Sequence, residues 1–179
     1  MPTPRRTLQR YETPNHARFL MFSCYRRVDL FRNDAIKTAF VDRLIQTHQR
    51  RPLLLFAWVV MSNHVHLLLR PDAADDVQSL LRRLKPAFAK SVLTRWHELD
   101  APILAKVRDK SGNERFWQPG GGYDRNIFSG DEFAEKVRYI HTNPVRAGLV
   151  ERPTDYRWSS AAKHAGLVTE GPPLAAICV

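Results

Sequence analysis

The strongest constraint on the fold is a pair of apolar segments separated by only two residues. Residues 53–61 read LLLFAWVVM and residues 64–70 read HVHLLLR, with Ser62-Asn63 between them. Their length and composition are typical of strands, the first of them buried on both sides. The two-residue link is a turn signal, and Pro71 ends the second segment. The sequence therefore predicts a buried β-hairpin.

Other strands and helices are expected on both sides of this hairpin. They are a strand at 17–26, a helix at 33–49, a helix at 75–99, a loop at 101–114, a strand within 115–128 and a third helix from residue 129. Asn33 and Ser129 are the predicted N-caps of the first and third helices, with Glu132 at capping-box spacing from Ser129. We expect Pro86 to kink or divide the second helix and Pro144 to end the third.

The order of these elements indicates the fold class. Strand, helix, strand, strand, helix, strand is the order of a split βαβ unit. The prediction is an α+β, ferredoxin-like antiparallel sheet with helices on one face and an added C-terminal helix. With 179 residues the chain has the length of one domain, and its 44% hydrophobic content is enough for a packed core.

The domain organisation follows from the distribution of apolar and Pro-rich segments. We predict a basic N-terminal arm at residues 1–16, one domain at 17–162 and a flexible tail at 163–179. The longest apolar run, Leu53–Met61, is much shorter than the ~20 residues of a membrane helix, and we identify no signal peptide. Cys24 and Cys178 form no metal or redox spacing, which favours a reducing cytosol.

The charge balance indicates a polyanionic partner. Lys and Arg number 28 against 18 Asp and Glu, a formal net charge of +10. Such an excess favours binding to nucleic acid, and less often to an anionic membrane. Solubility is the alternative explanation. It does not explain residues 81–97, where basic side chains repel one another with no acid among them: Arg82, Arg83, Lys85, Lys90 and Arg95.

A pair of histidines lies at the start of the second hairpin strand. Side chains alternate along a strand, so His64 and His66 point to one face and Val65 to the other. A buried imidazole without hydrogen-bond partners costs roughly 1–3 kcal/mol. A shared metal ion would satisfy both rings at once. Packing within an ordinary core is the alternative for this pair.

Two other metal or hydrolase sites are excluded by the neighbouring residues. Nucleotidyl hydrolases of the histidine-triad type need a third alternating histidine, and Leu68 occupies that position. A closed structural zinc site needs four ligands, normally with cysteines, and neither cysteine lies near the pair. A two-histidine site is open, which is typical of catalytic or ligand-binding sites.

The third helix contains a candidate nucleophile. At ~100° per residue, its apolar stripe consists of Phe133, Val137 and Ile140. Tyr139 lies about 120° from the middle of this stripe, and Asn143 lies one turn later on the same side. Tyr139 is therefore not simply another core aromatic, although a packing or surface tyrosine is the alternative.

Four segments together resemble the single-tyrosine HUH transposases. They read VVMSNHVHLLLRP, FWQPGGGYDRN, YIHTNPVRAGLV and DYRWSSA. Within that group the chain is most similar to the REP-associated tyrosine transposases, which are also described as IS200-like. The resemblance extends over residues 17–162, with the motifs in the expected order. It implies an RRM-like variant of the ferredoxin fold, in agreement with the element order.

The resemblance implies roles for particular residues. His64 and His66 would bind a divalent metal ion, Asn143 would complete the metal shell, and Tyr139 would be the nucleophile. The ion would be magnesium or manganese, and manganese accepts imidazole ligands more readily. Tyr123 is a competing tyrosine, for which we expect packing or stacking on a base.

The implied activity is cleavage and rejoining of single-stranded DNA through a 5′-phosphotyrosine link, at hairpin (REP-like) elements. The implied partner is single-stranded or hairpin DNA and not a membrane. The protein would act as a monomer or homodimer. Its implied location is the bacterial cytoplasm, in association with the nucleoid. The candidate DNA-binding residues are Arg82, Arg83, Lys85, Tyr123 and Arg125. Trp117 could stack on a base, but a core position is the better interpretation.

Three alternatives stay open from the sequence. The first is an inactive, domesticated nucleic-acid-binding module of the same fold. The second is a metal-dependent phosphoesterase that uses water and forms no covalent intermediate. The third is a structural ferredoxin-like domain in which the histidines only pack. The presence of His64, His66, Tyr139 and Asn143 together favours the enzyme.

Overall fold

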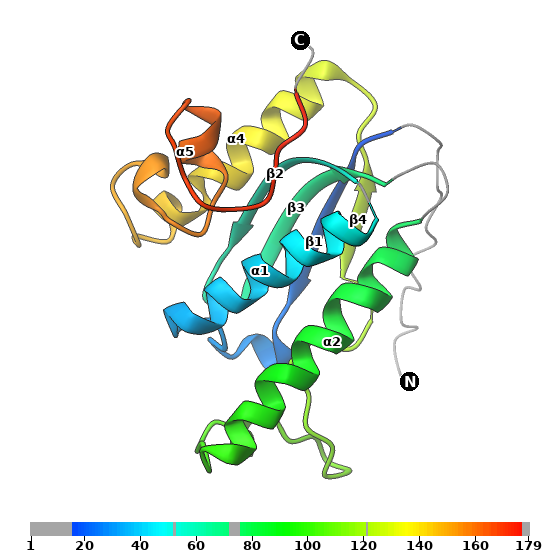
Figure 1. Ribbon diagram of the computed structural model, residues 1–179, viewed down its shortest axis with the longest axis vertical. Coiled ribbons are helices and arrows are strands. Elements are labelled where there is room, and N and C mark those ends of the chain that lie inside the picture. Colours follow the sequence, from blue (N-terminus) through cyan, green and yellow to red (C-terminus); the bar gives the residue numbers. More distant parts are fainter. Residues whose placement is uncertain (1–15, 52, 72–75, 121, 177–179) are drawn as a thin grey trace, which may run out of the picture.

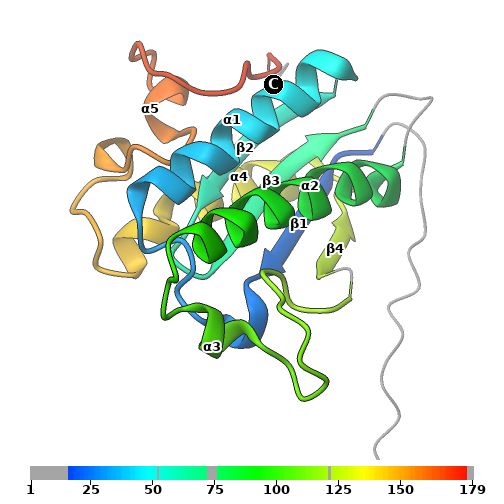
Figure 2. The same cartoon turned by 60° about the horizontal axis from the view of Figure 1, so that its bottom comes forward.

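The computed structural model describes residues 16–51, 53–71, 76–120 and 122–176. Within these residues one antiparallel sheet is formed, with the strand order β2-β3-β1-β4 (Figures 1 and 2). The strands are β1 (Arg18–Ser23), β2 (Leu54–Val60), β3 (His64–Arg70) and β4 (Tyr123–Asn126). Because β3 is inserted between β2 and β1, the sheet is the split βαβ arrangement, and the predicted ferredoxin-like α+β class is confirmed.

Helices lie on both faces of this sheet. The long helices α1 (Asp34–Arg50) and α2 (Val77–Glu98) cover one face, and α4 (Gly130–Arg146) covers the other (Figures 1 and 2). The shorter elements are η1 (Tyr25–Arg27), α3 (Leu104–Val107), η2 (Pro153–Asp155) and α5 (Ala161–His164). The first and last helices of the sequence prediction begin at the predicted N-caps, since Asn33 accepts from Ala35 N and Ser129 Oγ accepts from Glu132 N.

The alternation of side chains along the strands divides the apolar interior into two clusters. Leu20 of β1 and Val65 of β3 belong to the cluster under α1 and α2. Phe19 of β1 and Leu68 of β3 belong to the cluster under α4. A bulge in β2 at Phe56 turns two successive residues toward the α4 face. The histidine face of β3 is therefore the face that α4 covers.

The free edge of β2 is covered by the segment that follows η2. Val60 N donates to Trp158 O at 2.9 Å, and Trp58 N donates to Ser160 Oγ at 3.0 Å. The Tyr156 hydroxyl also donates to Val60 O at 2.9 Å. The DYRWSSA segment thus satisfies backbone groups that an edge strand would otherwise leave to water.

Of the two outcomes predicted for Pro86, a kink or a division of the second helix, the division is wrong. α2 is one helix from Val77 to Glu98 with the proline inside it. Pro86 removes the hydrogen bond to the carbonyl of Arg82, and both residues are on the exposed side of the helix, where water can replace the lost donor. The opposite side of the helix is held by buried contacts such as those of Leu84 and Phe88.

The prediction that Asn143-Pro144 ends the third helix is also wrong. α4 continues through Pro144 to Arg146, and backbone bonds from Ala147 N to Asn143 O (3.0 Å) and from Leu149 N to Pro144 O (2.9 Å) extend this end. Gly148 follows the end of the helix, and its φ of +68° is the left-handed conformation common just after a helix. Asn143 therefore keeps its helical position one turn after Tyr139.

The structure adds detail on the segments predicted as a loop and as a tail. The expected loop at 101–114 contains α3 and an isolated bridge between Arg108 and Glu114. In the region expected to be a flexible tail, Ala175 N donates to Leu55 O at 2.8 Å. The basic arm, except His16, and Cys178 lie outside the described residues. Among the described residues, no helix combines the length and apolarity needed to cross a membrane.

Candidate active site

The two histidines of β3 lie next to each other on the α4 face of the sheet. Their ring centroids are 4.8 Å apart and the ring planes are nearly perpendicular, at 87°. On the neighbouring strand β1, Ser23 pairs with His64 and Met21 pairs with His66. Because β3 is an interior strand, this pair is fixed by hydrogen bonding on both sides of its backbone.

His66 is a buried polar residue whose hydrogen-bonding groups are not used. The residue is 1% exposed, and neither ring nitrogen has a hydrogen-bond partner among the described residues. Burial, followed by the nearby His64, lowers the pKa of His66 from 6.5 to about 3. The ring is therefore neutral near pH 7, which is the form that binds metal ions.

His64 is half-buried and lies among three polar neighbours. Its Nδ1 is 2.7 Å from the Asn63 side-chain oxygen. Burial and then the charge of Arg27 lower the pKa of His64, and a hydrogen bond with the Asn143 side chain opposes this shift. His64 thus connects the start of β3 to α4 through Asn143.

α4 places the candidate nucleophile beside these rings. The ring centroid of Tyr139 is 5.4 Å from that of His66 and 6.0 Å from that of Phe19. Ile140, the next residue, is fully buried in the cluster under α4, whereas Tyr139 is 36% exposed. The phenol ring therefore borders the histidines at the edge of the core, where a substrate can reach it.

These residues fit a divalent cation in their chemistry. His66 supplies two unpartnered nitrogens, His64 a second imidazole, and Asn143 an amide from the facing helix. Among the described residues, no group of three or more His, Cys, Asp or Glu side chains is placed to hold a metal ion. A metal ion here would take neutral nitrogen and amide ligands, and it would keep open positions for other oxygens.

The candidate DNA-binding residues divide between the two faces. The ring centroid of Tyr123 in β4 lies 6.0 Å from that of Phe19, and Arg125 Nε lies 2.7 Å from Glu132 Oε1 of α4. Tyr123 and Arg125 therefore both lie on the histidine face. The basic residues of α2 lie on the opposite face: Arg82, Arg83 and Lys85. The Lys85 ammonium lies over the rings of Phe22 and Trp117, and Trp117 is 8% exposed, which confirms its core position.

Phe19 and Arg27 are two site neighbours that the sequence analysis did not single out. Phe19 is stacked on His66 and contacts both Tyr123 and Tyr139. Strand alternation in β1 could have predicted that Phe19 lies on the face opposite Leu20. Arg27 is exposed and has a left-handed backbone, with φ +56°, and its effect on His64 has no local sequence signal.

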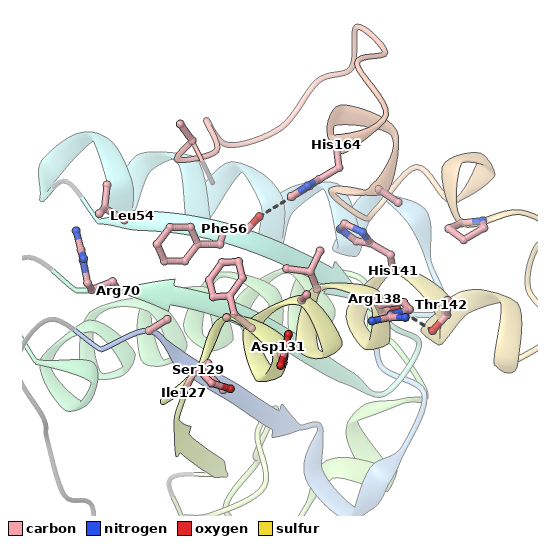
Figure 3. A pocket seen from close by; sticks show the side chains of 18 of the residues that line it. Leu54, Phe56, Arg70, Ile127, Ser129, Asp131, Arg138, His141, Thr142 and His164 are labelled. Carbon is pink, nitrogen blue, oxygen red and sulfur yellow. Dashed lines mark hydrogen bonds between the residues drawn. The ribbon is translucent and has the colours of Figure 1, made fainter. Parts of the chain in front are cut away.

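A pocket of about 1300 Å³ lies along other residues of α4 (Figure 3). Phe56 and Leu54 of β2, Val137 and His141 of α4, and His164 of α5 are among its lining residues. His141 contacts Ser160 Oγ at 2.8 Å, and His164 contacts Phe56 O at 2.6 Å. Neither the β3 histidines nor Tyr139 lines this pocket, so it is separate from the candidate active site.

Known sequences similar to this chain include transposases. Residues 13–143 match the family described as Transposase IS200 like. The REP-associated tyrosine transposase of Escherichia coli (strain K12) is 26% identical over 118 residues, which are 65% of this chain and 59% of the relative. A Haemophilus influenzae protein that carries a REP-associated tyrosine transposase name is 28% identical over 115 residues, which are 64% of this chain and 62% of the relative. The chain thus spans about three fifths of the length of these curated relatives.

A solved structure has the same fold. It is that of a REP-associated tyrosine transposase bound to a REP hairpin, with a TM-score of 0.67 and 22% sequence identity, and the superposition covers 96% of this chain and 94% of the other. At this identity the likeness establishes the fold. The family match spans more than half of the chain, including the β3 histidines and Tyr139, and the chain therefore belongs to the IS200-like transposase family.

Proposed function

We propose that this chain cleaves and rejoins single-stranded DNA at hairpin elements through a tyrosine–DNA intermediate, and that it does so with a divalent metal ion. The observation that supports this most strongly is the position of the Tyr139 ring, 5.4 Å from the ring of the buried, unpartnered His66. The family and the REP hairpin bound by the structural relative support the choice of substrate.

In the proposed first step the Tyr139 oxygen attacks the phosphorus of a phosphodiester. A bond forms between the tyrosine oxygen and phosphorus, and the bond from phosphorus to the 3′ oxygen breaks. The 3′ oxygen leaves with the bonding electrons and takes up a proton, while the phenol proton passes to solvent. The 3′-hydroxyl of a second strand then reverses this attack. Each step exchanges one phosphodiester for another, so no nucleoside triphosphate is consumed.

The residues of the site have distinct tasks in this reaction. Bound magnesium or manganese, held by His64, His66 and Asn143, would polarise a non-bridging phosphate oxygen and stabilise the developing charge. Phe19 holds the Tyr139 ring from one side. The Arg146 guanidinium lies 5.7 Å from the centre of the same ring, a cation–π contact that helps to hold the ring in place.

DNA binding is proposed mainly on the histidine face. Tyr123 is 40% exposed and stands beside Phe19, a position suited to stacking on an unpaired base. Arg125, on the same strand, offers charge to a phosphate. Arg82, Arg83 and Lys85 would contact only a part of the DNA that passes around the molecule. A monomer or a homodimer is compatible with this assignment.

The deciding experiment is the trapping of a covalent product. Labelled single-stranded hairpins from the flanks of the gene are incubated with the protein and Mn²⁺ and analysed on denaturing gels. Wild type should form a protein–DNA adduct. Tyr139→Phe should form none but should still bind the hairpin, and Tyr123→Phe, the matched control, should keep the adduct. An adduct with Tyr139→Phe would contradict the assignment.

Other outcomes identify the alternatives. Hairpin binding by wild type without cleavage would indicate an inactive binding module. Cleavage without any covalent product would indicate a phosphoesterase that uses water. Undiminished cleavage in EDTA, or in a variant with alanine at both His64 and His66, would exclude the metal from the reaction.

A further inference from the structure

The turn before β3 places an amide oxygen against the first histidine. Asn63 Oδ1 lies 2.7 Å from Nδ1 of His64, a distance typical of a hydrogen bond. Asn63 belongs to the two-residue turn of the hairpin and precedes the strand, so its side chain does not follow the alternation that would separate neighbours within β3. Asn63 itself is not among the residues that are proposed to hold the metal ion or attack DNA.

The contact favours one position for the imidazole proton. An amide oxygen only accepts hydrogen bonds, so Nδ1 of neutral His64 carries the proton and Nε2 carries the lone pair. With Nδ1 occupied by Asn63, Nε2 is the nitrogen left to bind a metal ion, and the Asn143 side chain of α4 also lies within hydrogen-bonding reach of this ring. A histidine that binds a metal ion through one nitrogen is normally oriented by a hydrogen bond of this kind at the other.

The backbone around Asn63 is held in place by a neighbouring segment. Asn63 O accepts from Cys24 N at 2.8 Å, and Ser62 O accepts from Phe31 N at 2.9 Å. The turn is closed by Met61 N, which donates to His64 O at 2.8 Å. The backbone of the asparagine is thus held on both sides of the turn. Its side-chain oxygen, Oδ1, is already beside His64 before any ligand binds.

We propose that Asn63 is a positioning residue, which holds His64 in the tautomer with the proton on Nδ1 and so directs the Nε2 lone pair toward the space shared with His66 and Asn143. The part of this inference that concerns the ligand rests on the proposed metal-dependent function. The part that concerns the tautomer does not, because the hydrogen bond exists in the metal-free chain.

The tautomer is measured directly in the metal-free protein. Long-range ¹⁵N–¹H NMR spectra of ¹⁵N-histidine-labelled protein near pH 7.5 distinguish a protonated from an unprotonated ring nitrogen. Wild type should show His64 protonated on Nδ1. Asn63→Leu, which keeps a similar volume without an acceptor, should lose this preference, and Asn63→Asp should restore it. Ser62→Ala is the control in the same turn and should behave as wild type. An unchanged tautomer in Asn63→Leu would overturn the proposal.

Metal binding gives a second readout. Titration with Mn²⁺ by calorimetry should show affinity about ten- to a hundredfold weaker for Asn63→Leu than for wild type, the usual effect of removing such a partner. Asn63→Asp should retain the affinity. Equal affinity for wild type and Asn63→Leu would overturn the proposed role in positioning and leave the proposed function intact. No Mn²⁺ binding by wild type, with the tautomer preference still dependent on Asn63, would count against the metal-dependent function alone.

Discussion

His66 is the residue whose hydrogen-bonding needs the fold leaves unmet. It is fully buried between Phe19 and Tyr139, and both nitrogens are without partners in the part of the chain that the structure describes. Such a group costs roughly 1–3 kcal/mol of stability unless a ligand satisfies it. Active-site residues that lower the stability of the ligand-free protein are common, because the arrangement that function requires is often not the most stable one.

Replacing this ring by an apolar side chain should stabilise the metal-free protein. We expect His66→Leu to raise the free energy of unfolding by about 1–2 kcal/mol, because two desolvated nitrogens are removed from the core. Urea unfolding in the presence of EDTA measures this. His64→Leu is the control and should bring no such gain, since His64 is half-buried and bonded to Asn63. A clear loss of stability in His66→Leu would show that the imidazole is satisfied by the fold.

A half-buried histidine of α4, His141, should make stability depend on pH. Burial, and then the nearby His164, lower the pKa of His141 from 6.5 to about 4. Between these two values the unfolded chain binds a proton that the folded chain does not. The free energy of unfolding should therefore fall as the pH decreases from about 6.5 to about 4, by up to about 3 kcal/mol from this residue. Urea unfolding at several pH values should show a shallower decrease for His141→Gln, and identical slopes would contradict the assignment.

At the scale of elements, the edge strand β4 depends on a buried ion pair. The Arg18 guanidinium of β1 lies 2.8 Å from the Asp124 carboxylate, and both side chains are almost completely buried. Gly122, just before β4, admits no side chain, because a Cβ there would lie 2.2 Å from Met21 O. These two contacts fix the register of the strand that contains Tyr123 and Arg125.

Removing one partner of this pair should therefore be costly. We expect Arg18→Ala to lower the free energy of unfolding by about 3–5 kcal/mol, because the Asp124 carboxylate stays buried and loses the charge of Arg18. Arg115→Ala breaks an exposed pair with Asp109 and should cost about 1 kcal/mol or less. Chemical denaturation of the two variants compares them. Similar small losses in both would mean that the carboxylate reaches solvent.

The sequence predicts elements better than it predicts their ends. The hairpin, the N-caps at Asn33 and Ser129 and the final strand follow from local patterns, and the structure confirms them. The continuation of two helices through proline could not be predicted from local patterns. The tendency of a residue before proline to avoid the helical conformation is a local effect. Packing of Leu84 on one helix and Ile140 on the other outweighs it.

The candidate site was only partly readable from the sequence. Strand alternation alone is sufficient to place His64 and His66 on one face of the sheet. The proximity of Tyr139 to them depends on which face of the sheet α4 covers, and the order of elements does not determine this. The contacts of Phe19 and Asn63 require the register of β1 on β3 and the geometry of the turn, both of which arise only in the folded chain.

At the scale of the whole molecule, basic residues lie on both faces, and we expect those on the histidine face to contact DNA. Binding to single-stranded DNA weakens with salt, with a slope of about 0.7 per phosphate contact on logarithmic axes. If the DNA lies on the histidine face, Arg125→Gln should reduce this slope by about 0.7 and Arg82→Gln should leave it unchanged. Fluorescence anisotropy with a labelled hairpin over a range of salt concentrations measures both. The reverse result would place the DNA against α2.

The covering of the β2 edge by the segment around Trp158 has a consequence for how copies of the protein meet. Exposed strand edges template the addition of further strands, and this is a common route to aggregates. In the described chain β2 is already paired, and the other edge is β4, a strand of four residues with charged Arg125 on it. Within the residues that the structure describes, neither edge offers a long, flat row of free backbone groups, so crowded copies of this protein should stay separate rather than grow into continuous sheets.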